Sequence, residues 1–135
     1  MTTRQVIENY YNAIDAGNMD EAYSYMSPGL RYWISGEGSW PLGGWYNGAE
    51  STSKMMSGLS ERFLAGFKLT INSIVVEGER ASVLLETNGI RTDGKKYHNQ
   101  VHFAIVVQDG KIVEQQEFLD TIVAKDLFCG PMLEN

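Results

Sequence analysis

Apolar residues recur every three or four positions in three early segments, which is the spacing of an amphipathic helix. The pattern predicts a first helix over Thr2–Ala16, a second that Asn18 caps and Pro28-Gly29 ends, and a third over Ala49–Arg62. Thr2 and Gln5 have the spacing of a capping box, in which each side chain satisfies a free backbone N–H of the other residue.

In the second half of the chain the pattern changes to runs of β-branched and aromatic residues separated by glycine-containing turns, which is typical of antiparallel strands. The predicted strands are Phe67–Val76, Arg80–Arg91, Tyr97–Val107 and Lys111–Leu119, with a short strand over Leu30–Ile34 and a last helix from Asp120-Thr121 through Phe128. Helices followed by antiparallel strands predict an α+β fold. Three helices are too few to cover both faces of such a sheet, so we expect a curved sheet that wraps around them and leaves an internal pocket.

The last hairpin decides which side chains share a face. A three-residue loop, Gln108-Asp109-Gly110, would set Val101 opposite Glu117 and Phe103 opposite Gln115. A two-residue loop would shift the register by one and turn Glu117 to the other face. We expect the three-residue loop. One face then holds the residues Asn99, Val101, Phe103, Ile105, Val113, Gln115 and Glu117, and the other holds His98, Gln100, His102, Ala104, Val106, Ile112, Glu114 and Gln116.

The segment Ser35–Gly48 has no periodicity and contains five glycines and two tryptophans, so we expect a long loop. Large aromatic side chains are costly to expose. Trp40 and Trp45 therefore cover something: either the core beneath a packed loop, or the mouth of a pocket beneath a lid.

Composition narrows the class of protein. The 135 residues are expected to form a single domain over 1–135, with 43% hydrophobic and 21% charged residues, as in a globular protein. The net charge of −6, without basic patches, argues against nucleic acid and anionic membranes as partners. No signal peptide or apolar run long enough to span a membrane is evident, and the single Cys129 fits a cytoplasmic location.

Carboxylate chemistry is the chemistry that the sequence offers. His98 and His102 lie four strand residues apart, about 13 Å, too far to share one metal ion, so we expect neither metal nor cofactor. Glu117 on the pocket face would have a pKa raised by desolvation, which suits a general acid or base. The alternatives for Glu117 are a structural carboxylate paired with arginine or a group at the solvated rim.

Further candidates surround Glu117. If the turn at Asp93-Gly94 has two or four residues, Glu86 and Asn88 join the pocket face; otherwise Glu86 faces solvent. Tyr10, Tyr32 and Asn99 could donate hydrogen bonds to a substrate oxygen, although core packing also explains the two tyrosines. Val101, Phe103, Gln115, Met56, Asn88, Trp40 and Trp45 complete the expected substrate-binding set.

The ending DGKIVEQQEFLDT, together with the helical N-terminus, resembles SnoaL-like, ketosteroid isomerase-related proteins of the nuclear transport factor 2-like superfamily. The resemblance implies a cone-shaped, cystatin-like α+β fold with a deep pocket, and a homodimer formed through the outer face of the sheet. It is weak evidence for a reaction, because the fold hosts several chemistries.

Catalytic residues carry over from that superfamily only in part. The first-helix tyrosine of ketosteroid isomerases matches Tyr10, but Ile34 stands where their base would be, and Val101, or His102 with a different gap, stands where their second aspartate would be. In limonene epoxide hydrolase-like members the tyrosine matches Tyr32 and the two acids match Glu86 and Glu117. Leu84 replaces their arginine and Ile34 their asparagine.

These observations predict a protein that binds a small hydrophobic, oxygenated molecule, with cofactor-independent isomerase or cyclase activity through Glu117, Glu86, Tyr32 and Tyr10. The alternatives are an epoxide hydrolase-like enzyme, or a non-catalytic ligand-binding or dimeric interaction domain.

Overall fold

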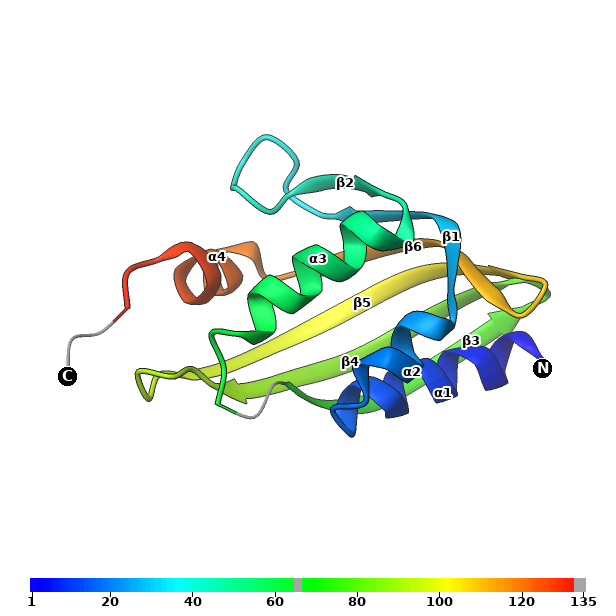
Figure 1. Cartoon of the computed structure of the whole chain (residues 1–135), viewed down its shortest axis with the longest axis horizontal. Helices are drawn as coiled ribbons and strands as arrows, with labels where there is room; N and C mark the ends of the chain where they lie inside the picture. The colour runs from blue at the N-terminus through cyan, green and yellow to red at the C-terminus, as the bar shows by residue number, and fades with distance from the viewer. Residues whose placement is uncertain (65–66, 133–135) are drawn as a thin grey trace.

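The computed structural model describes residues 1–64 and 67–132, which form four helices and six strands (Figure 1). The helices are α1 (Thr3–Asp15), α2 (Met19–Ser24), α3 (Ala49–Ser60) and α4 (Thr121–Cys129). The strands are β1 (Met26–Ile34), β2 (Gly44–Asn47), β3 (Lys68–Glu77), β4 (Arg80–Ile90), β5 (Lys96–Gln108) and β6 (Lys111–Leu119).

The six strands form one curved, open sheet in the order β2-β1-β6-β5-β4-β3. β1 runs parallel to β6, and the other neighbours are antiparallel, so the sheet is mixed. Helices α1, α2 and α3 lie over the same face of this sheet (Figure 1). Helix α1 packs against β3, β4 and β5, whereas α3 packs against β1 and β2. The predicted α+β architecture, a curved sheet around three early helices, is confirmed.

The first helix begins where the sequence predicts. Thr2 and Gln5 form the capping box, with the Thr2 hydroxyl accepting from the Gln5 backbone at 3.1 Å and the Gln5 side chain accepting from the Thr2 backbone at 2.9 Å. The buried face of α1 consists of Val6, Ile7, Tyr10, Tyr11 and Ala13. Hydrophobic burial of this stripe holds α1 on the sheet and brings two tyrosines to its concave side.

The end of the second helix was predicted wrongly. Helix α2 ends at Ser24, and Pro28 and Gly29 lie within β1, which begins at Met26. The register between β1 and β6 shifts between Met26 and Arg31. Proline cannot donate to a regular ladder, and this irregular stretch of the strand accommodates it.

The last hairpin has a different turn and register from those predicted, although Glu117 and Gln115 still face the predicted side. Gln108 pairs with Lys111, so the loop has two residues, Asp109 and Gly110, both with positive φ as in a type I′ turn. A bulge on the β6 side then skips one residue, so that Val106 pairs with Glu114 and Phe103 with Glu117. The expected partners of Glu117 and Gln115 were therefore wrong by two residues.

A shift of two residues leaves the facing of side chains unchanged. Val101, Phe103 and Gln115 are buried on the inner side together, as predicted. Ile112, by contrast, lies before the bulge and is buried in the core, although the prediction placed it on the outer face.

The preceding hairpin turns Glu86 and Asn88 outward. The Arg91 N–H donates to the Lys95 carbonyl at 2.8 Å, so the turn Thr92–Gly94 has three residues rather than two or four. Glu86 then pairs with Gln100 and Asn88 with His98, while Leu85 pairs with Val101 on the inner face. The placement of Glu86 and Asn88 in the pocket is wrong, because it depended on the length of that turn.

The segment Ser35–Gly48 is only partly a loop, because Gly44–Asn47 forms strand β2 at the edge of the sheet. Trp40 is buried in the core, and its indole N–H donates to the Ser35 carbonyl at 2.8 Å. Gly36 allows this packing, since a Cβ there would lie 2.8 Å from the Trp40 ring. Trp45 pairs with Trp33 and is 37% exposed. In the part of the chain that the structure describes, no helix is long and apolar enough to cross a membrane.

Candidate functional site: a tyrosine-lined pocket with one carboxyl

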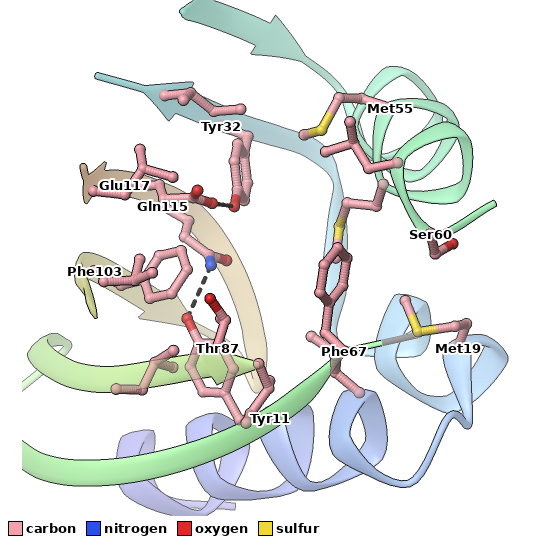
Figure 2. A pocket seen from close by; sticks show the side chains of 18 of the residues that line it. Tyr11, Met19, Tyr32, Met55, Ser60, Phe67, Thr87, Phe103, Gln115 and Glu117 are labelled. Carbon is pink, nitrogen blue, oxygen red and sulfur yellow. Dashed lines mark hydrogen bonds between the residues drawn. The ribbon is translucent and has the colours of Figure 1, made fainter. Parts of the chain in front are cut away.

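A cavity of about 420 Å³ lies between the concave face of the sheet and helices α1 and α3. Its apolar wall comes mainly from Ile14, Met19, Ile34, Met55, Met56, Leu59, Leu64, Phe67, Leu69, Leu85, Val101, Phe103, Leu119 and Phe128. Polar groups among them include Tyr11, Tyr32, Gln115 and Glu117, which lie together in Figure 2, and Tyr10. A mostly apolar hollow with a few convergent polar groups is the usual form of a small-molecule site.

Glu117 is placed in this cavity by β6. The hydroxyl of Tyr32, on the neighbouring strand β1, donates a hydrogen bond to Glu117 Oε1 (Figure 2). Burial raises the pKa of the Glu117 carboxyl from 4.5 to about 7, while the hydrogen bond from Tyr32 lowers it. The Glu117 residue as a whole is half-buried, and it lines the wall of the cavity. Near neutral pH Glu117 is therefore divided between its two protonation states.

Three tyrosines surround the carboxyl and stay protonated. Burial, with the nearby Glu117 charge as a further cause, raises the pKa of Tyr10, Tyr11 and Tyr32 above its ordinary value. These hydroxyls are consequently hydrogen-bond donors throughout the physiological range. Their placement follows from the buried stripe of α1 and from the inward alternation of β1.

Some buried polar atoms of the pocket lack a partner. Gln115 Nε2 donates to the Tyr11 hydroxyl at 2.9 Å, but Gln115 Oε1 has no hydrogen-bond partner among the described residues. The same holds for the Tyr10 hydroxyl and Thr87 Oγ1. Burial raises the pKa of the Tyr10 hydroxyl, and the neighbouring Gln115 amide lowers it. Buried polar groups without partners are rare in folded proteins.

The pocket brings together most of the predicted site. Glu117, Tyr10, Tyr32, Val101, Phe103, Gln115 and Met56 all line it. Asn99 lies behind the wall, where it donates to the Tyr97 hydroxyl at 2.9 Å and to the Asp120 carbonyl at 3.0 Å. It is a buried structural amide rather than a donor to a ligand.

Four predicted residues lie elsewhere. Glu86 and Asn88 are on the outer face beside His98, at 3.8 Å and 3.1 Å from its ring nitrogens.

Trp40 packs in the core, and the guanidinium carbon of Arg31 lies 4.3 Å from the ring centre of Trp45. No residue of Ser35–Gly48 lines the cavity, so the lid interpretation of this segment is wrong.

Other lining residues were missed: Tyr11, Leu85, Thr87, Tyr97, Phe67 and Phe128. Tyr11 lies within the predicted first helix, but the prediction did not assign it to the site. Leu85 and Thr87 occupy the inner positions that the prediction gave to Glu86 and Asn88. Alternation along β4 predicts that Leu85 and Thr87 face one side and that Glu86 and Asn88 face the other. The length of the following turn decides which of the two pairs points inward.

Glu117 is the only Asp, Glu, Lys, Arg or His among the described residues that line the cavity. Over the described part of the chain no group of three His, Cys, Asp or Glu side chains could hold a metal ion. The arrangement can therefore bind an apolar molecule, donate hydrogen bonds to its oxygen from tyrosine, and move one proton through one carboxyl.

The chain belongs to the SnoaL-like domain family, whose pattern matches residues 7–115. This assigns it to the nuclear transport factor 2-like superfamily that its ending resembles. No curated protein matches the chain.

Solved structures share the fold at low sequence identity. A cystatin-like protein of unknown function from Xanthomonas campestris has a TM-score of 0.83 and 22% identity, with 95% of this chain and 98% of that chain covered. A protein from Jannaschia sp. CCS1 described as a SnoaL-like polyketide cyclase has a TM-score of 0.72 and 19% identity, with 95% and 94% covered. An epoxide hydrolase of the LEH-like type from M. tuberculosis has a TM-score of 0.76 and 17% identity, with 94% and 89% covered.

Proposed function

We propose that this protein binds a small hydrophobic molecule with an oxygen function and moves a proton on it through Glu117, as a cofactor-independent isomerase or cyclase. The observation that carries this proposal is a single carboxyl, with a pKa of about 7, in an apolar pocket beside three protonated tyrosines. A general base works best when its pKa lies near the operating pH.

One carboxyl is enough for a proton shift. Glu117 as the carboxylate takes a proton from the carbon next to a carbonyl, and the electron pair of the C–H bond becomes the enolate. In an isomerisation the same carboxyl, now protonated, returns the proton to another carbon. In a cyclisation the enolate carbon adds to a second carbonyl of the same molecule, whose C=O π bond breaks, and the protonated carboxyl gives its proton to the alkoxide that forms. Tyr10 is suited to donate to the enolate oxygen, because its buried hydroxyl has no partner in the described protein. Tyr32 holds the carboxylate in place.

Epoxide hydrolysis needs both a base and an acid, whereas the described residues that line this pocket contain one carboxyl, Glu117. Opening an epoxide with water requires a base for the water and an acid for the epoxide oxygen. The second predicted acid, Glu86, lies on the outer face of the sheet. This argues for proton transfer within one molecule, although relatives in fold include a polyketide cyclase and an LEH-like epoxide hydrolase.

The test is deuterium exchange. Enolisable hydrophobic ketones would be incubated with the protein in D2O, and loss of the α-proton signal would be followed by NMR. We expect exchange that falls by at least about 100-fold in Glu117→Gln. Glu114→Gln, the same change on the outer side of β6, is the matched control and should exchange like wild type. Ligands that raise the melting temperature of wild type without any exchange would support a binding protein and contradict the catalytic proposal.

We further propose a cytoplasmic homodimer formed through the outer face of the sheet. That face exposes 43% of Leu84, 41% of Phe118 and 37% of Trp45. The ring of Trp33 lies 5.3 Å from Phe118 and 6.3 Å from Trp45, so the aromatic groups form a continuous stripe. Sedimentation should give a dimer that Phe118→Glu dissociates, and a wild-type monomer at all concentrations would refute it. Cell fractionation tests the location.

A further inference from the structure

The polar end of the pocket has a particular balance of donors and acceptors. Gln115 is 1% exposed, and its amide N–H donates to the Tyr11 hydroxyl at 2.9 Å. In this orientation of the amide, Oε1, which can only accept, has no partner among the described residues. Tyr10, also 1% exposed, offers a hydroxyl that has no partner either.

The residues that carry these two unpartnered groups are linked through Tyr11. The rings of Tyr10 and Tyr11 are 4.9 Å apart between centroids, edge to face, and Tyr11 in turn holds Gln115. All three side chains line the same cavity, and Figure 2 draws the bond from Gln115 to Tyr11 inside it.

A carbonyl oxygen cannot satisfy both groups, because it accepts from Tyr10 and gives nothing to Gln115 Oε1. An O–H group satisfies both: its oxygen accepts from Tyr10, and its proton is donated to Gln115. A buried acceptor that is left without a partner costs free energy, so a ligand that donates to Gln115 Oε1 should bind more tightly than one of the same shape that cannot.

We propose that the pocket selects a hydrophobic molecule with a hydroxyl or enol O–H, held between Tyr10 as donor and Gln115 Oε1 as acceptor, and that Tyr11 positions the Gln115 amide. This inference rests on the proposed function in that it concerns the same pocket, and it names the group by which the ligand is oriented. Gln115 contacts the ligand, whereas Tyr11 acts through Gln115.

The test compares three probes of one shape: 2-naphthol, 2-methoxynaphthalene and 2-acetylnaphthalene, with dissociation constants measured by calorimetry at pH 7. We expect wild type to bind the naphthol at least about tenfold more tightly than the ether or the ketone, because only the naphthol donates to the buried acceptor. In Gln115→Leu this preference should disappear while the ether still binds. Gln116→Leu, on the outer side of the same strand, should keep the preference.

Tyr11→Phe provides the readout for positioning. The freed amide can rotate, so the ratio of naphthol to ether affinity should fall although the apolar contacts of the pocket remain. Equal binding of naphthol and ether by wild type would overturn the proposal, and so would a preference that survives Gln115→Leu but is lost in Glu117→Gln. Neither outcome bears on deuterium exchange, which depends on Glu117, so the two proposals fail separately.

Discussion

Two buried polar clusters of this protein differ in whether their hydrogen bonds are complete. In the first, the fully buried Arg91 donates from Nε to Asp93 Oδ1 at 2.8 Å and from its terminal nitrogens to Asp93 Oδ2 and to the Leu127 and Pro131 carbonyls. Every guanidinium nitrogen has an acceptor. The second cluster, in the pocket, leaves the Tyr10 hydroxyl and Gln115 Oε1 without partners in the described protein.

The difference separates a structural role from a binding role. Arg91 secures the C-terminal end of α4, and Arg62 assists by donating to the Leu127 carbonyl at 3.3 Å. A buried charge is tolerated there because the protein itself supplies all its partners. In the pocket the Tyr10 hydroxyl and Gln115 Oε1 have no partner among the described residues, and burial raises the pKa of Glu117. Incomplete hydrogen bonding in a cavity thus indicates a ligand site, and complete hydrogen bonding indicates a structural one.

The largest expected effect comes from breaking the complete cluster. Arg91→Met removes the cation and leaves the buried Asp93 carboxylate without its guanidinium, so the free energy of unfolding should fall by about 4 kcal/mol. Urea denaturation followed by circular dichroism measures this. Arg80→Met, an exposed arginine at the start of β4, is the control and should cost less than about 0.5 kcal/mol. Similar losses for both variants would contradict the role of Arg91.

Glu117→Gln should change how stability depends on pH. The folded-state pKa of Glu117 lies above its ordinary value of 4.5, so the folded protein binds the proton more tightly than the unfolded chain does. Wild type therefore loses stability as pH rises from about 4.5 to about 7, by up to about 3 kcal/mol, and nothing further above that range. The glutamine variant lacks this loss. Denaturation at pH 4.5, 6 and 8 should show its stability rising relative to wild type.

Tyr32→Phe should change the pKa of Glu117 by removing its hydrogen-bond donor. Loss of the donor removes the bond that lowers the pKa of Glu117, so the pKa should rise further. The stability cost should be about 2 kcal/mol at pH 8, where the charged carboxylate is the stronger acceptor, and smaller at pH 5. Tyr25→Phe controls for loss of a hydroxyl outside the pocket. A cost for Tyr32→Phe that does not vary between the two pH values would argue against the bond.

The smallest expected effect is a gain in stability, in Tyr10→Phe. Tyr10→Phe removes a buried hydroxyl that has no partner, so stability should rise by up to about 1 kcal/mol. Tyr46→Phe makes the same chemical change where the hydroxyl donates to the Leu42 carbonyl at 2.8 Å, and it should lower stability by about 1 kcal/mol. Thermal unfolding compares the two variants directly. A stability loss in Tyr10→Phe would mean that this hydroxyl is already hydrogen-bonded in the free protein.

The fold could be predicted because it depends on periodicity, which the sequence displays. The capping box at Thr2 and the alternation along β5 are local, and each is strong enough to set an element without help from distant residues. The family resemblance at residues 109–121 pointed to the same architecture. Helix α2 was the exception, since Pro28 and Gly29 suggested a helix end although they fall in an irregular stretch of strand.

The site was harder to predict because facing depends on single residues. Glu117 was assigned to the correct face but to the wrong partner. The turn is one residue shorter than predicted, which alone would move Glu117 to the other face, and the bulge in β6 moves it back. Glu86 was assigned to the wrong face because the turn Thr92–Gly94 has three residues. Nothing in the local sequence fixes turn length or reveals a bulge. Nor does it reveal that Trp40 packs in the core while Trp45 lies on the outer face, which tertiary packing decides.

The most direct test of the account is the pKa of Glu117 itself, measured by a carbon-13 NMR titration of its side-chain carboxyl with Glu117→Gln to assign the resonance. The account predicts a midpoint of about 7, because burial in the pocket disfavours the charged form. A midpoint near the ordinary value of 4.5 would mean that water solvates the carboxylate freely. Glu117 would then be no proton-transferring group at neutral pH, and the catalytic proposal would fall.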